Sequence, residues 1–175
     1  GRLRTTLYRL THTAAAPVLT SNRETVGLHP DVAVDLYDQA ESISGIENGT
    51  LPDASQLDAA LIEELLPGWY DDWVILARER NRQRQLHAIE AMADVLTRRC
   101  SYARALDLGL HAVERDPLRE SAHRSVIVVH LAEGNLHAAV TQYRAYLAHL
   151  AEAGLGPRPS SRLSAMIAPC LALAG

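Results

Sequence analysis

The segment CSYARALDLGLHAVERDP, residues 100–117, aligns with GNLHAAVTQYRAYLAHLA, residues 134–151, when the sequence is compared with itself at a shift of 34 positions. The alignment pairs Ala105 with Ala139, and both copies carry apolar residues at helical spacing. From Asp53 onward the chain is a succession of such patterns with short breaks, without an alternating strand pattern. We therefore predict a mainly α fold built from helical hairpins that repeat along the chain.

Each copy resembles a tetratricopeptide repeat, in which small residues let two helices approach and large residues fill the gap to the next hairpin. The first copy turns at Cys100-Ser101. The second turns at Gly134-Asn135, but Tyr146 stands where a small residue is usual, and no proline closes this copy. A third, degenerate pair of helices is expected over residues 35–64. The structural positions expected within the repeats are Ala105, Pro117, Ala139 and Tyr143.

Residues 65–74, LLPGWYDDWV, contain both tryptophans of the chain around two adjacent aspartates. Adjacent carboxylates can form a general acid and base pair, but neighbouring helix positions point about 100° apart and do not converge on one substrate atom. We interpret the segment as a hinge, in which Pro67-Gly68 ends one helix and Asp71 and Asp72 stabilise the start of a long helix over about residues 71–99. The aromatic residues assigned to this hinge are Trp69, Tyr70 and Trp73.

The two tryptophans of the hinge are expected to lock it to the repeat stack, because they lie four positions apart and share one helix face. A surface role for one of them, in a dimer or polymerase contact, is the alternative.

The first thirty residues differ in kind from the rest. In the opening GRLRTTLYRLTH, Leu3, Leu7 and Leu10 share one face, which predicts a short amphipathic helix. Residues 1–30 carry four arginines and one glutamate, a net charge of +3, which leaves −7 for residues 31–175 within the total of −4. A basic segment ahead of an acidic body indicates that only the first segment meets an anion.

The segment VLTSNRETVGLHP contains two β-prone runs, residues 18–21 and 24–28, around Asn22-Arg23, where Asn tolerates the positive φ of a tight hairpin turn. A helix followed by a hairpin corresponds to the C-terminal half of a winged helix-turn-helix. Such a helix suits the major groove, and such a hairpin tip suits phosphates or the minor groove. The residues expected to contact DNA are Arg2, Arg4, Thr5, Tyr8, Arg9 and His12 on the helix and Arg23 at the tip.

Two further patterns favour no binding chemistry. In residues 78–84, RERNRQR, the guanidinium groups spread around a helix, so we interpret the run as a solvated face on which Glu79 forms ion pairs. His123, His130 and His137 recur every seven residues, but the last two flank a predicted turn and no Cys or carboxylate completes a ligand set. We therefore expect no metal site.

Nothing in the sequence indicates catalysis. Asp116, Ser121 and His123 fall at a predicted helix start, where Ser or Asp caps, and this interpretation is favoured over a catalytic triad. A Gly-rich phosphate loop is absent, so no enzyme activity and no cofactor are expected. Cys100 and Cys170 are isolated, and the sequence contains neither a leader nor an apolar run long enough for a membrane helix, which predicts a cytoplasmic location.

Five phrases, in order, are similar to the bacterial transcriptional activator domain: LRTTLYRL, ETVGLHPDVAVDL, LLPGWYDDWV, RERNRQRQLHAIEAMADVL and AVERDPLRESAHR. This domain typifies antibiotic-regulatory activators of actinobacteria, in which an OmpR-type winged helix precedes tetratricopeptide-like hairpins. The resemblance implies a transcriptional activator that binds double-stranded promoter DNA, pairs with a second copy and recruits RNA polymerase. The alternative function is a repeat scaffold that binds only protein or a small ligand.

The resemblance implies three parts: residues 1–30 as the C-terminal part of a truncated winged helix, residues 31–168 as the activator domain, and residues 169–175 as a tail. The chain starts inside the presumed recognition helix, so we expect its leucine face to be incompletely buried. No membrane partner is expected.

Overall fold

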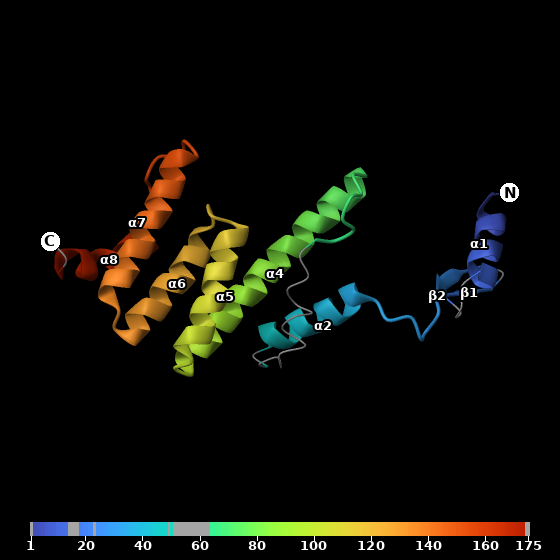
Figure 1. Ribbon diagram of the computed structural model, residues 1–175, viewed down its shortest axis with the longest axis horizontal. Helices are drawn as coiled ribbons and strands as arrows, with labels where there is room; N and C mark the ends of the chain where they lie inside the picture. Colours follow the sequence, from blue (N-terminus) through green and yellow to red (C-terminus); the bar gives the residue numbers. More distant parts are fainter. Residues whose placement is uncertain (1, 14–17, 23, 49, 51–63, 174–175) are drawn as a thin grey trace. The chain divides into compact units, whose positions relative to one another are not determined.

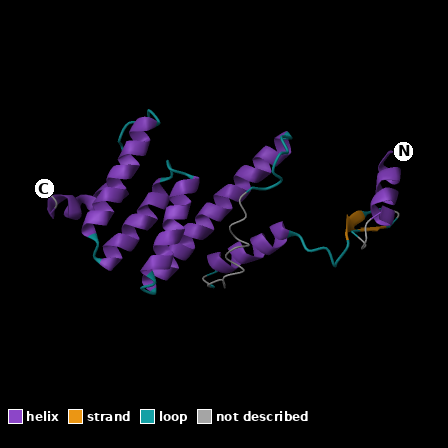
Figure 2. Ribbon diagram, viewed as in Figure 1, coloured by secondary structure: helices purple, strands orange, loops and turns teal. Residues whose placement is uncertain are grey.

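The computed structural model describes residues 2–13, 18–22, 24–48, 50 and 64–173. The chain divides into two compact units, Gly1–Asp38 and Gln39–Gly175. Among the described residues, the strands are confined to one short hairpin and the other regular elements are helices (Figure 2). The predicted mainly α fold is therefore confirmed.

The first unit contains a helix followed by a β-hairpin, in the predicted order. Helix α1 spans Arg2–Thr13, and the antiparallel strands β1 (Leu19–Ser21) and β2 (Val26–Leu28) follow it. Asn22 shapes the turn with its side chain, because its Oδ1 accepts the backbone N–H groups of Glu24 (2.8 Å) and Thr25 (2.7 Å). The side-chain oxygen of Asn22 thus takes the place that a backbone carbonyl oxygen has in an ordinary turn.

The second unit contains helical hairpins, each made of two antiparallel helices (Figure 1). Helices α4 and α5 form one hairpin and α6 and α7 the next, and α8 packs against α7. The helices are α2 (Asp35–Glu47), α4 (Asp72–Arg98), α5 (Tyr102–Arg115), α6 (Glu120–Glu133), α7 (Leu136–Glu152) and α8 (Ser161–Leu173). Helix α4 matches the long helix predicted from about residue 71 to 99.

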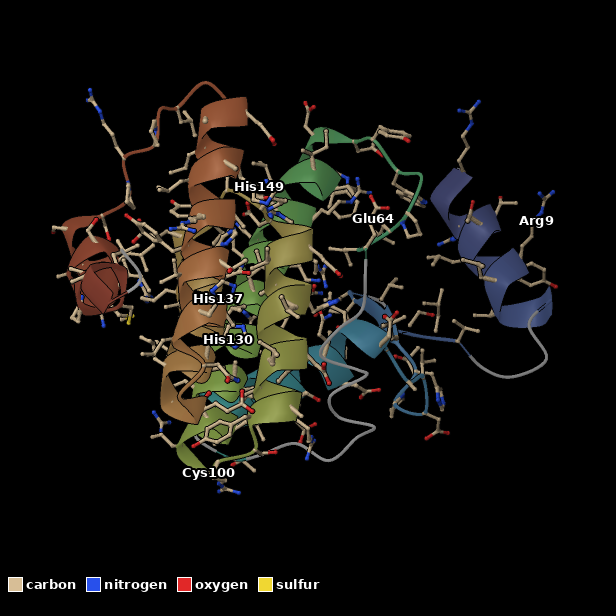
Figure 3. All side chains as sticks on the ribbon, turned by 60° about the vertical axis from the view of Figure 1, so that its left-hand side comes forward. Arg9, Glu64, Cys100, His130, His137 and His149 are labelled. Carbon is tan, nitrogen blue, oxygen red and sulfur yellow. The ribbon has the colours of Figure 1, made fainter. Side chains whose placement is uncertain are left out.

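The turns of the two hairpins confirm the shift of 34 residues. Helix α6 ends at Gly134, in the left-handed conformation (φ 87°), with Asn135 N–H donating to the carbonyl oxygen of His130 at 2.8 Å. Helix α4 ends in the same way at Cys100 (φ 57°; Figure 3), and Ser101 N–H donates to the Leu96 oxygen at 2.9 Å. Both are Schellman-type ends, which satisfy the last carbonyl groups of a helix.

Small residues lie at buried contacts between the helices. Ala105 and Ala139 are both 0% exposed, as predicted. A Cβ on Gly109 of α5 would lie 2.9 Å from Val126 Cγ2 of α6, so this glycine permits the contact between the hairpins. Tyr143, also predicted as structural, is buried in the core of the second hairpin.

Helices α2 and α8 lie at the two ends of the repeat array. Helix α2 supplies the first helix of the predicted third pair, and its Ile43 and Ile46 join the core of α4 and α5, but residues 51–63 lie outside the described part. The expected tail begins within α8, which continues through Leu173 and buries Cys170. This correction has a simple cause, since Leu163, Ile167 and Cys170 form one apolar helix stripe.

Candidate functional site

Helix α1 presents most of the residues predicted to contact DNA. The six that lie on α1 are exposed: Arg2, Arg4, Thr5, Tyr8, Arg9 and His12. Arg9 projects outward in Figure 3. Arg23, predicted at the hairpin tip, lies outside the described residues. On the opposite face Leu7 is half-buried, whereas Leu10 is 46% exposed, which confirms the expected incomplete burial of the leucine face.

Local contacts fix part of the exposed face of α1. The Tyr8 and His12 rings stack with their centroids 4.0 Å apart, and His12 Nδ1–H donates to the Tyr8 carbonyl oxygen at 2.8 Å. Arg4 and Tyr8 line a hollow of about 520 Å³ whose other wall is the hairpin turn. Helix α1 thus combines cationic, hydroxyl and aromatic groups, which are the types that contact phosphates and base edges.

The LLPGWYDDWV segment turns and then begins α4, as the hinge interpretation predicts. Gly68 has a φ of 81°, and Trp69 N–H donates to the Leu66 carbonyl oxygen at 3.2 Å, which closes the turn. Asp71 is the N-cap of α4, but its side chain makes no capping hydrogen bond. The contribution expected from Asp71 and Asp72 is therefore that of negative charge at the positive end of the helix.

Arg78 fixes this segment against α4. Its Nε donates to the carbonyl oxygen of Leu65 (3.1 Å), and its Nη2 donates to those of Leu66 (2.9 Å) and Trp69 (3.2 Å). Its Nη1 lies 3.0 Å from Oε1 of Glu64, which is labelled in Figure 3. The expectation of a solvated face is wrong for this arginine. Arg78 lies one turn after the fully buried Val74 and therefore shares its helix face, which faces the protein interior. Helical spacing from Val74 could have identified this orientation.

The expected packing of the tryptophans is wrong. Trp69 is 53% exposed and Trp73 is 58% exposed, and Tyr70 between them is more exposed still. Val74, the neighbour of Trp73, is fully buried, so the inward face of α4 is rotated by about 100° from the one assumed. The segment is instead a fixed turn that presents aromatic side chains on the surface, a composition found in protein interfaces.

The phrase DPLRESAHR, residues 116–124, forms a polar network between α4 and α6. Arg119 Nε donates to Glu90 Oε1 at 2.6 Å, and its Nη1 donates to Gln83 Oε1 at 2.7 Å. Ser121 Oγ donates to the same Glu90 oxygen at 2.7 Å. The Arg119 and Glu90 side chains are each only 13% exposed, so their ion pair is shielded from water. The pair joins α4 and α6, the first helices of successive hairpins.

Asp116, Ser121 and His123 do not cap α6 with their side chains, because the N-cap is Arg119 and no side-chain capping bond forms there. Asp116 instead accepts from Arg82 Nη1 at 3.1 Å. Asp116 and Ser121 bond to side chains of α4, which lies close enough to compete for them, whereas His123 has other partners. Pro117, the predicted end of the repeat, follows α5 and offers its carbonyl oxygen to the neighbouring helix.

His123 is a buried polar residue of α6. Its Nε2–H donates to the Pro117 oxygen at 3.0 Å, and its Nδ1 accepts from Gln142 Nε2 at 2.9 Å. The centroid of the Tyr146 ring lies 4.7 Å from that of the imidazole, with the two rings tilted by 37°, so the tyrosine at the usually small position packs against His123. Burial lowers the pKa of His123, and His149 at 5.7 Å also lowers it, against the opposing bond to Pro117. Its role is structural.

Residues 50–170 match the model of the bacterial transcriptional activator domain. This match covers more than half of the 175 residues. The chain belongs to the bacterial transcriptional activator domain family. This family consists of transcription regulators and is not a catalytic family. The comparison with curated proteins found no match.

The matched bacterial transcriptional activator domain contains the hinge and the repeat positions: Trp69, Tyr70, Asp71, Asp72, Trp73, Ala105, Pro117, Ala139 and Tyr143. The α1 helix and the β-hairpin precede the matched residues. No group of three or more His, Cys, Asp or Glu side chains is placed to hold a metal ion within the part of the chain that the structure describes. No helix among the described residues is both long and apolar enough to span a bilayer.

Proposed function

We propose that this chain is the core of a transcriptional activator that binds promoter DNA through α1 and the β-hairpin. The family match supports activation of transcription. The charge distribution supports the assignment of DNA binding to the first segment alone. Residues 1–30 carry +3 and residues 31–175 carry −7, so phosphate attracts the first segment and repels the second. In this proposal α1 is the C-terminal part of the recognition helix of an OmpR-type winged helix.

The exposed side chains of α1 carry the recognition step. Arg2, Thr5 and Arg9 face the major groove, where an arginine can donate two hydrogen bonds to a guanine. Arg23, which the sequence predicts at the hairpin tip, contacts phosphate or the minor groove. The stacked Tyr8 and His12 rings add a rigid polar and aromatic surface beside the arginines.

The acidic repeat domain contacts protein. Trp69, Tyr70 and Trp73 are exposed on a turn that Arg78 holds in place, and aromatic side chains of this kind dominate the energetics of protein interfaces. We assign this surface to pairing with a second copy or to contact with RNA polymerase. The same surface favours the alternative function, a protein-binding scaffold with no DNA binding of its own.

Promoter binding at several salt concentrations tests this proposal. The measurement uses a protein that contains this chain with a complete winged helix. Arg9→Ala should cost about 1–3 kcal/mol of discrimination between the promoter and a sequence with one changed guanine. Arg23→Ala should weaken binding to all sequences and lower the salt slope by about one unit. Arg144→Ala, an exposed site on α7, is the charge-matched control and should change neither. If neither Arg9→Ala nor Arg23→Ala differs from the wild type, the scaffold function is the better account.

A further inference from the structure

A cavity of about 380 Å³ lies between α4, α6 and α8, away from the exposed aromatic turn. Each helix contributes one apolar side chain to its wall: Ala91, Val128 and Met166. Helix α8 is held in place here, because Glu120 of α6 accepts the backbone N–H of Ser160 at 2.7 Å and also its hydroxyl. A cavity of this size fits a small ligand or the end of a peptide.

The acidic groups of this cavity are already paired. Glu90 accepts from Arg119 and from Ser121, as described above. Asp94 forms an ion pair with Arg98, one turn further along α4. Their negative charges are therefore largely compensated by partners within the protein.

The arginines of the cavity, unlike its carboxylates, are not paired within the described part of the protein. Arg124 of α6 and Arg162 of α8 both line it, and neither has an ion-pair partner among the residues that the structure describes. In a domain with a net negative charge, two unpaired guanidinium groups around one hollow leave a local excess of positive charge. Guanidinium groups bind planar carboxylates with paired hydrogen bonds.

We propose that this cavity binds a carboxylate that is joined to a small apolar group. The carboxylate pairs with Arg124 and Arg162, and the apolar group lies against Ala91, Val128 and Met166. Both a free carboxylic acid and the C-terminus of a peptide have this chemistry. The site goes beyond the proposed function, since DNA recognition does not use it.

Titration of the chain, followed by NMR, tests the site. The probes are 4-methylvalerate as the free acid and acetyl-Ala-Leu as the peptide end, each beside its neutral amide. We expect saturable shifts of the Ala91, Val128 and Met166 methyl signals with at least one acid and with neither amide. The acid that binds more tightly identifies the source of the carboxylate.

Charge variants link binding to the two arginines. Arg124→Gln and Arg162→Gln should each weaken the better acid at least about tenfold, because each removes a charge-assisted hydrogen bond. Arg162 is exposed, so its variant tests the site even if Arg124→Gln reduces stability. Arg144→Gln, on α7 outside the cavity, makes the same charge change and should keep wild-type affinity.

Several results would overturn the proposal. These are the absence of saturable binding by either acid, equal binding of acids and amides, or equal affinity of the Arg162→Gln and Arg144→Gln variants. Tighter binding of inorganic phosphate than of both acids would also reject it, because the ligand would then be a phosphate.

Discussion

Cys100 adopts a left-handed backbone conformation, with a φ of 57°, at the position where the next repeat has Gly134. A side chain costs roughly 1–2 kcal/mol in this conformation, whereas glycine adopts it freely. We therefore expect Cys100→Gly to raise the free energy of unfolding by about 1 kcal/mol and Gly134→Ala to lower it by a similar amount. No atom lies within 4 Å of a Cβ built on Gly134, so the second effect reports backbone strain alone. Urea denaturation checks both, and a destabilised Cys100→Gly would show that the turns are not equivalent.

His123 should make stability depend on pH. Burial keeps its pKa below the usual 6.5, so the unfolded chain binds more protons than the folded one as the pH falls through 6.5. The folded state consequently loses stability on acidification towards the folded pKa, and it keeps this contribution above pH 6.5. His123→Gln should flatten the dependence, measured as urea midpoints between about pH 5 and 8. His137→Gln, an exposed control, should not. If the wild type, His123→Gln and His137→Gln show the same dependence of stability on pH, His123 does not cause it.

At the scale of elements, hairpin packing rests on small residues. Ala105→Leu should cost about 1–3 kcal/mol, because a side chain that is fully buried between α4 and α5 cannot gain three carbon atoms without strain. Arg104→Leu, next to it on the exposed side of α5, should cost less than about 0.5 kcal/mol. Thermal unfolding in which Arg104→Leu is the more damaging change would contradict the repeat register.

The turn before α4 should depend on an arginine more than on its tryptophans. Trp69→Ala should cost less than about 1 kcal/mol, because the indole is half exposed and leaves no closed cavity. Arg78→Met should cost about 1–3 kcal/mol, since it leaves the Leu65, Leu66 and Trp69 carbonyl groups without their donor. If equilibrium denaturation shows a larger loss of stability for Trp69→Ala than for Arg78→Met, the tryptophan is part of the core and this account is wrong.

The elements themselves could be predicted from the sequence, because local signals define them. Breaks at Pro67-Gly68 and Gly134-Asn135, together with the spacing of apolar residues, placed the helices of the repeats correctly. The inward face of α4 could not be predicted from the segment alone. Trp73 and Val74 are adjacent and both apolar, and only the packing against other helices decides that Val74 is buried.

At the scale of the whole molecule, the polar network shows a second limit of sequence reasoning. Arg119 lies 29 positions from Glu90 and 36 from Gln83. No local pattern joins such distant residues, although the shift of 34 does place α4 and α6 in equivalent positions. Residues 116–124 lie within one of the phrases that resemble the family, and they supply Arg119, one partner of an ion pair that is shielded from water between successive hairpins.

We assign DNA binding to the basic first segment and protein contact to the acidic domain that follows it. The most direct test is a salt titration of promoter binding that compares residues 31–175 with a protein containing this chain and a complete winged helix. With a net charge of −7, residues 31–175 should not bind DNA near 0.15 M salt, about the physiological value, whereas the longer protein should bind with a steep salt dependence. Binding of residues 31–175 as tight as that of the longer protein would contradict the account.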